Sequence, residues 1–389
     1  MTDDRRGPGN AFLETLLGLE YTGDRADLFS QACVGQFEAS DPTRYEYLFA
    51  QVFEPDVLKE VAVLAGLPYP EVAGLVHRPT AAVAGLAERR AAAADLSVVE
   101  LVNLAAALIS ISRFDVADEV LDIAARGAAD PGDRFEVEML RFTVTNRRDD
   151  GTGSPHAFRA MRAAIGEGGV PADRIMDACS QAVVWYLKRK EVAEDDFPWF
   201  LATGRRLVAR PDRLDPGSLS AWYRAIAMIP AARGEPVKTR LFMRYAREAA
   251  EETIKRRPRA YEMHFLKTYH ESSLKEHMYV TRDLAAAEEA GRALIDLDPW
   301  WAPSYGELAE AYARFGRHEQ AADLYERAVR TGPPYVAHHL VRAARQRERI
   351  GQDEQAAAHH RSLAELVPDG AALVAGSAAG APDEGTSGR

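Results

Sequence analysis

The sequence predicts an all-α protein in which pairs of helices stack in series as an α-solenoid. The first observation behind this fold class is a spacing typical of two short packed helices, carried by Tyr305, Leu308, Ala309, Tyr312, Ala321, Tyr325, Ala328 and Pro333. The second is that Pro299, Pro333 and Pro368 recur 34 and 35 residues apart, close to the period of a two-helix unit. Such helices are apolar on one side only, so each pair must stack on a neighbour to be stable.

We predict three regions along the chain. Residues 1–90 form an N-terminal helical region in which no repeat phase can be read. Within it, residues 61–75 have the small, glycine and apolar spacing of a helix-turn-helix, although two ordinary packed helices explain that spacing as well. Residues 91–370 form the solenoid. Residues 371–389 are rich in Gly, Ala, Ser and Pro with little to bury, so we expect a disordered tail.

One helix pair inside the solenoid departs from the period. Pro258 lies 41 residues before Pro299, and the excess of seven residues equals two helical turns. Either the first helix of this pair, about residues 260–278, is lengthened, or a loop at about residues 279–283 bulges outward. Upstream of it, the repeat pattern is matched more loosely, at Trp222, Ala225 and Gly234 among other positions.

Composition excludes several function classes. A formal charge of -11 and a pI near 5.5 disfavour a nucleic-acid partner, because phosphate binding depends on clustered Lys and Arg. Cys33 and Cys179 form no CxxC pair, which predicts a reducing, cytoplasmic location without disulfides. No apolar run is long enough to span a bilayer, so no membrane contact is expected. Arginine and alanine are abundant and lysines are only seven, a bias that indicates a GC-rich bacterial genome.

The segment 302–334 resembles the tetratricopeptide repeat (TPR) family. Tyr305 stands at the usual aromatic position, Leu308 and Ala309 at the leucine and the small residue, and the other positions named above follow in phase. The resemblance is firm over residues 285–368 and looser from about residue 96. It implies a right-handed superhelix whose first helices line a concave groove. Family members receive a peptide, a partner protein or sometimes a small molecule there, and most are not enzymes.

The resemblance places several arginines in the groove: Arg314 on one first helix, and Arg342, Arg345 and Arg349 on the next. The last three recur at three- and four-residue spacing, so they share a helix face that can form bidentate hydrogen bonds with a carboxylate or phosphate. The alternative is that these arginines lie in solvent and bind no ligand. The Lys and Asn clamp of some family members is absent, since Gly306 and Val341 occupy places where such side chains are expected.

Eight of the ten histidines fall in the last third of the chain, which raises the question of a metal site. His270 and His277 are seven residues apart, about 10.5 Å along a helix, too far to share one ion. An HExxH motif would need histidine at position 274, where Leu274 stands. We therefore predict no metal. Phosphate-binding glycine motifs are missing too, so no cofactor is expected.

The lengthened helix carries the candidate for catalysis. At helical spacing, one polar stripe holds Tyr261, His264, Thr268, Glu271 and Lys275. In an enzyme, His264 would move a proton, Glu271 would orient it, and Tyr261 would donate a hydrogen bond. In a scaffold, the same stripe binds polar groups of a ligand or lies in water.

Three functions follow. The first is a TPR-like scaffold or adaptor that binds a peptide, a partner protein or an acidic small molecule in its concave groove. The second is an all-helical enzyme of bacterial specialised metabolism with a pocket on helix 260–278. The third is a ligand-sensing transcriptional regulator, which would need a basic surface around His77.

Overall fold

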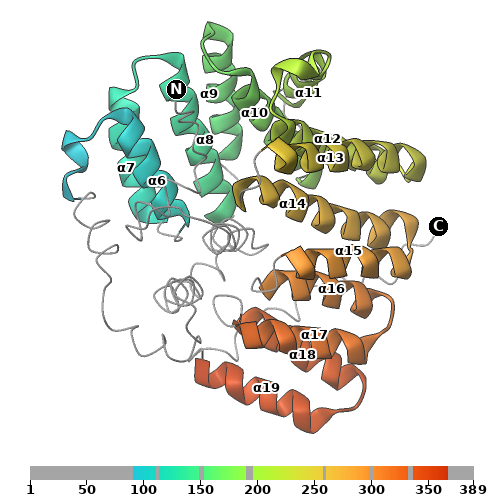
Figure 1. Cartoon of the computed structure of the whole chain (residues 1–389). Helices are drawn as coiled ribbons and strands as arrows, with labels where there is room; N and C mark the ends of the chain where they lie inside the picture. The colour runs from blue at the N-terminus through green and yellow to red at the C-terminus, as the bar shows by residue number, and fades with distance from the viewer. Residues whose placement is uncertain are drawn as a thin grey trace. The chain divides into compact units, whose positions relative to one another are not determined.

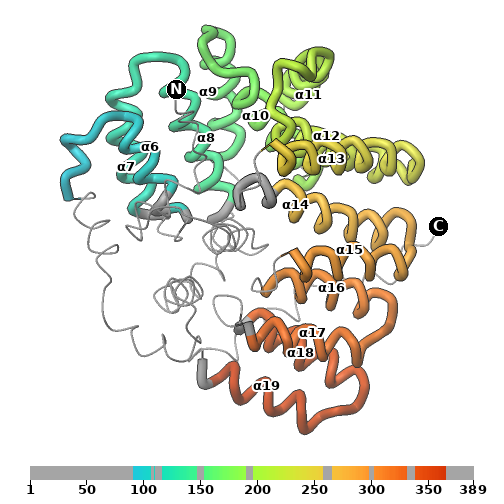
Figure 2. Tube along the Cα trace, in the orientation of Figure 1, coloured from blue at the N-terminus to red at the C-terminus, as the bar shows by residue number. Residues whose placement is uncertain are grey.

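A computed structural model describes residues 91–110, 114–148, 153–189, 196–256, 260–297, 302–331 and 336–366 (Figure 2). Every regular element within these ranges is a helix, which confirms the all-α class. The chain divides into two compact units, Met1–Arg282 (unit 1) and Asp283–Arg389 (unit 2). The predicted helix-turn-helix with His77 and the predicted tail lie outside the described residues. The region boundaries at 90 and 370 and the handedness of the solenoid stay predictions.

Unit 1 is a series of helices in which most pack on the next one along the chain. Three contacts, α6 with α8, α10 with α12 and α12 with α14, join helices that are not consecutive. The described helices are α6 (Val98–Ser110), α7 (Phe114–Gly127), α8 (Pro131–Arg148), α9 (Ser154–Glu167), α10 (Ala172–Lys188), α11 (Asp196–Val208), α12 (Pro216–Ala232), α13 (Pro236–Arg256) and α14 (Ala260–Glu276), with short turns η1 (Ala93–Asp95) and η2 (Pro211–Arg213).

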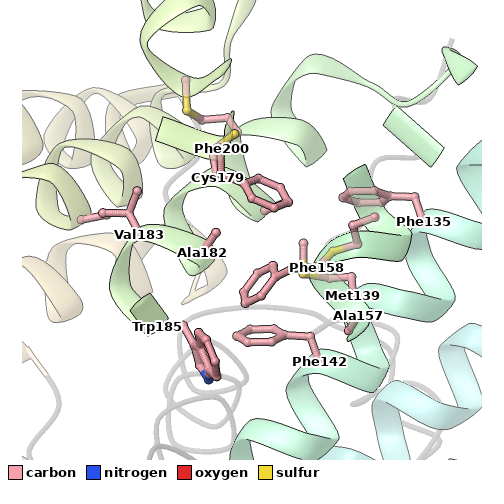
Figure 3. Close-up of a cluster of buried hydrophobic side chains, with 14 of the residues drawn as sticks. Phe135, Met139, Phe142, Ala157, Phe158, Cys179, Ala182, Val183, Trp185 and Phe200 are labelled. Carbon is pink, nitrogen blue, oxygen red and sulfur yellow. The ribbon is translucent and has the colours of Figure 1, made fainter. Parts of the chain in front are cut away.

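The core of unit 1 is aromatic and centres on Phe158 of α9, which is fully buried (Figure 3). Its ring centroid lies 4.6 Å from that of Phe142, 5.8 Å from Trp185 and 5.5 Å from Phe200. Tilted and edge-on pairs at these distances add to the stabilisation that burial of the rings supplies. Four helices, α8 to α11, thus share one core through large side chains.

Trp222 of α12 is buried against a glycine. A Cβ on Gly204 of α11 would lie 2.3 Å from the ring of Trp222, closer than any side chain allows. The indole, which is fully buried, occupies the space that glycine leaves. Glycine at this position therefore permits α11 and α12 to approach closely.

The described part of unit 2 contains five helices, each packed on the next (Figure 1). They are α15 (Leu284–Leu297), α16 (Ala302–Arg314), α17 (His318–Thr331), α18 (Val336–Arg349) and α19 (Asp353–Leu366). Between them, small and large residues alternate: Ala309, Ala321 and Ala328 are fully buried, and Tyr305 and Tyr325 fill the space beside them. These are the positions that the spacing in the sequence picked out.

The same turn joins three helix pairs. Gly234, Gly316 and Gly351 follow α12, α16 and α18 with φ of 67°, 74° and 71°, values that favour glycine. After each of them, the next N–H bonds back to the helix, as in Arg317 to the carbonyl of Tyr312 at 2.8 Å. The α12–α13 pair of unit 1 therefore closes as the pairs of unit 2 do, which agrees with the looser repeat predicted there.

The lengthened helix of the sequence analysis is present. α14 continues directly into a π-helical turn, η3 (His277–Thr281), and the helix ends at Arg282 in the left-handed region with φ of 53°. Of the two alternatives, a longer helix or a bulging loop at residues 279–283, the structure has the longer helix through residue 281.

Candidate functional site

Helix α18 carries a basic stripe. Arg342, Arg345 and Arg349 lie on one side of it, as predicted, and His338 four residues before Arg342 extends the same line. Arg349 is exposed, and the others are half-buried. Arg314 at the end of α16 is exposed as well. Among the residues that the structure describes, Arg342 and Arg349 form no ion pair with a carboxylate. His338 was missed, because we tested histidines only as chelating pairs.

Helices α16 and α18 approach each other closely at Gly306 and His339. A Cβ on Gly306 would lie 2.6 Å from Cε1 of His339, whose ring is buried. Burial lowers the pKa of His339 well below its ordinary value, so the imidazole is neutral. Val341 is also buried, at 5% exposure, and the expectation that it faces a groove is wrong. Gly306 and Val341 serve helix packing.

Arg347 of α18 points to the opposite side from the stripe. It is only 8% exposed and contacts Asp323 at 2.6 Å and Glu326 at 2.8 Å, both on α17. Glu326 also receives a hydrogen bond from His359 at 3.0 Å. Burial raises the pKa of Glu326, but the hydrogen bonds from Arg347 and His359 outweigh it and hold that pKa below the ordinary value. Arg347 thus belongs to an interior ion pair that joins α18 to α17.

Unit 2 also has a hollow of about 410 Å³ on a different face from the stripe. Its apolar floor includes Leu308 and the nearly buried Tyr312 of α16. Burial first, and then the hydrogen bond with Glu288, raises the pKa of Tyr312. Most of the wall comes from α15 and α17, the second helices of their pairs, through Arg292, Ile295, Asp296, Gln320, Asp323 and Leu324.

The proposed catalytic stripe on α14 is only partly described. Thr268 and Glu271 are buried, whereas Lys275 is exposed. The hydroxyl of Thr268 donates to the carbonyl of Phe265 at 3.1 Å, within its own helix. Tyr261 and His264 lie in the first turns of α14, and their side chains are outside the described residues. Whether these groups act together stays a prediction.

Further along, α14 has a charged cluster that sequence reasoning missed. Arg240 of α13 places Nη2 2.7 Å from Nε2 of His277 and Nε 3.2 Å from the buried carboxylate of Glu276. Because a guanidinium only donates, Nε2 accepts, and we assign the proton to Nδ1, 3.0 Å from the hydroxyl of Thr281. Burial raises the pKa of Glu276, and Arg240 opposes that rise. No local pattern could reveal this cluster, since Arg240 is 36 residues from Glu276.

His270 and His277 lie near different arginines of α13. His270 lies near Arg247, and burial first, then this arginine, lowers its pKa to about 4. His277 contacts Arg240. The described part of the chain holds no group of three His, Cys, Asp or Glu side chains placed to bind a metal ion. Burial raises the pKa of the Cys179 thiol to about 12, so no thiolate ligand forms there.

Comparison with known families identifies one segment. Residues 304–334 match the tetratricopeptide repeat model. This TPR segment covers nearly all of α16 and the whole of α17, and it confirms the resemblance over that helix pair. No helix in the described ranges combines the length and apolar character needed to cross a bilayer.

Whole-chain comparisons add little. No curated protein matches the sequence. A solved structure of Naa15/Naa10 bound to HypK-THB is similar at 16% identity, covering 90% of this chain and 54% of that one, with a TM-score of 0.29. The chain thus spans about half the length of that protein.

Proposed function

We propose that the protein is a helical-repeat scaffold that binds an acidic segment of a partner protein on the basic stripe of α18. The observation that carries this proposal is the separation of arginines on that helix. Arg347 is neutralised inside unit 2 by two carboxylates, whereas Arg342 and Arg349 on the opposite side have no carboxylate partner within the described residues. Guanidinium groups so placed favour bidentate contacts with carboxylates.

The TPR segment supports a protein partner over a small metabolite, because repeats of this kind present side chains from successive helices along an extended surface. Arg314 on α16 and the stripe on α18 belong to successive first helices. A segment lying across both would contact positive charge at two places. Charge complementarity of this kind raises the association rate and selects the partner more than it adds affinity.

The test starts from an unbiased choice of ligand. A random-peptide phage library is selected on the whole chain, and the enriched peptides are synthesised and titrated by calorimetry. We expect acidic peptides whose affinity falls about tenfold or more when Arg345→Glu or Arg349→Glu is introduced. Arg361→Glu, on the exposed surface of α19 in the same unit, is the matched control and should leave affinity unchanged.

Two outcomes would overturn the proposal. One is enrichment of peptides with no acidic bias. The other is that the two stripe variants bind the peptides as tightly as the control variant does. Melting curves must show that all three variants are folded.

A further inference from the structure

Unit 1 contains a small hollow between α11, α12 and α13, with a volume of about 160 Å³. Its walls are apolar: Ile226, Ile229 and Pro230 from α12, and Phe242 from α13. Ile226, Ile229 and Phe242 are half-buried, so they form a lining that is open on one side. An apolar cavity of about 150 Å³ in another protein holds a molecule of benzene, so this hollow has room for one ring or a short branched chain.

The hollow lies where α12 is irregular. Pro230 sits in the last turn of the helix and has no N–H, so it cannot donate to the carbonyl of Ile226 four residues before it. Gly234 then reverses the chain with a φ of 67°. The hollow therefore lies beside a turn of α12 that lacks one regular backbone hydrogen bond.

Cationic residues complete the lining of the hollow. They are Arg205, at the end of α11, and Arg233 and Lys238, on either side of the α12–α13 turn, and the lining includes a single carboxylate residue, Glu235. Lys238 contacts Glu235 at 2.6 Å. The hydrogen bond from Lys238, together with the charge of Arg233, lowers the pKa of Glu235. Within the described part of the chain, Arg205 has no carboxylate of its own, and positive charge exceeds negative charge in the lining.

We propose that this hollow binds a small organic anion with a compact apolar body, such as an aryl carboxylate. The body would lie against Ile226, Ile229 and Phe242, and the carboxylate would face Arg205 and Arg233. An inorganic anion would leave the apolar walls unused, and a neutral apolar ligand would leave the cations unmatched. A peptide segment is too large, since pockets for drug-sized ligands have volumes of roughly 300–1,000 Å³. This site is in unit 1 and is independent of the function proposed for unit 2.

The experiment uses the full chain with labelled isoleucine methyl groups and two probes of the same shape, phenylacetate and the neutral phenylacetamide. Ile226→Val and Ile229→Val assign the two methyl signals. We expect phenylacetate to shift both signals in a saturable way, and phenylacetamide to bind at least about tenfold more weakly. Arg205→Gln and Arg233→Gln should weaken phenylacetate by a similar factor and leave phenylacetamide unchanged.

The arginines are exposed, so neither variant should disturb the fold. Arg256→Gln, at the exposed end of α13, is the matched control and should bind phenylacetate as the unaltered chain does. The proposal is wrong if phenylacetate at about 10 mM shifts neither methyl signal. It is equally wrong if acid and amide bind alike, or if both arginine variants keep full affinity.

Discussion

Units 1 and 2 stabilise stacked helices in different ways. Unit 1 shares an aromatic core among α8 to α11, with Phe158 in contact with rings from three other helices. Unit 2 buries small alanines together with tyrosines in the α16–α17 pair and ties α18 to α17 through Arg347. A repeated small-and-large pattern leaves a period in the sequence, whereas a shared aromatic core does not. This is why the repeat could be read in unit 2 and only faintly in unit 1.

The largest expected effect tests whether the aromatic core belongs to unit 1 alone. Phe158→Ala removes a fully buried ring and should lower the free energy of unfolding by about 3–5 kcal/mol. Hydrogen exchange should show faster exchange in α8 to α11 with little change in α16 and α17. Equal acceleration in both units would contradict the comparison, and Phe158→Leu should show the same pattern at smaller size.

The ion pair of Arg347 gives the next effect. Arg347→Ala leaves Glu326 beside a cavity and should lower the free energy of unfolding by about 2–4 kcal/mol, measured by urea denaturation. Arg347→Met keeps the volume but leaves the carboxylates of Asp323 and Glu326 without their guanidinium, so it should cost nearly as much. A methionine variant that recovers more than half of the loss would show that the packing, and not the ion pair, holds α18 on α17.

Within the described residues, one histidine of each unit has a lowered pKa that should make stability depend on pH. The pKa of His270 is about 4 in the folded protein and about 6.5 in the unfolded chain, and that of His339 is lowered as well. Between these values only the unfolded chain takes up the proton, so stability is complete above pH 6.5 and falls as the pH is lowered towards 4. The loss at His270 should be about 1–3 kcal/mol. His270→Gln should flatten the curve of unfolding free energy against pH between pH 4 and 6.5. An unchanged slope would show that His270 is not the group responsible.

Two glycine substitutions give the smallest effects and have opposite signs. Gly306→Ala places a methyl against the buried ring of His339 and should lower the free energy of unfolding by about 1–2 kcal/mol. Gly166→Ala, near the end of α9, meets nothing within 4 Å and should raise it by about 0.5 kcal/mol. Thermal melts of the two variants measure both shifts, and a stabilising Gly306→Ala would mean that α16 and α18 are not closely packed.

The sequence predicted the helices better than their contacts. The all-α class, the repeat around Tyr305 and the lengthened helix after residue 260 follow from local periodicity. Arg342 and Arg347 are alike in sequence, and only the position of α17 makes Arg347 an interior partner of Asp323 while Arg342 lies half-buried on the other side of the helix. Periodicity does not tell which charged residue of a helix meets a neighbour.

The sites show the same limit. Arg205 is a basic residue at a helix end, in the last turn of α11. That it also lines a hollow depends on Pro230 and Phe242, which belong to other helices. Another cluster likewise joins two helices and consists of Arg240, Glu276 and His277. No sequence motif in either helix could predict it.

The π turn η3 has a consequence for how this chain tolerates changes in length. A helix that gains one residue while both of its ends stay in place must hold the extra residue in a wider turn, and η3 is such a turn. Removing one residue from η3 can therefore be absorbed by a return to ordinary α-helical winding, with both ends still in place. In the regular turns of α14, a deletion of one residue would instead rotate everything after it by about 100°. The chain should thus tolerate a one-residue deletion in η3 better than one earlier in the same helix.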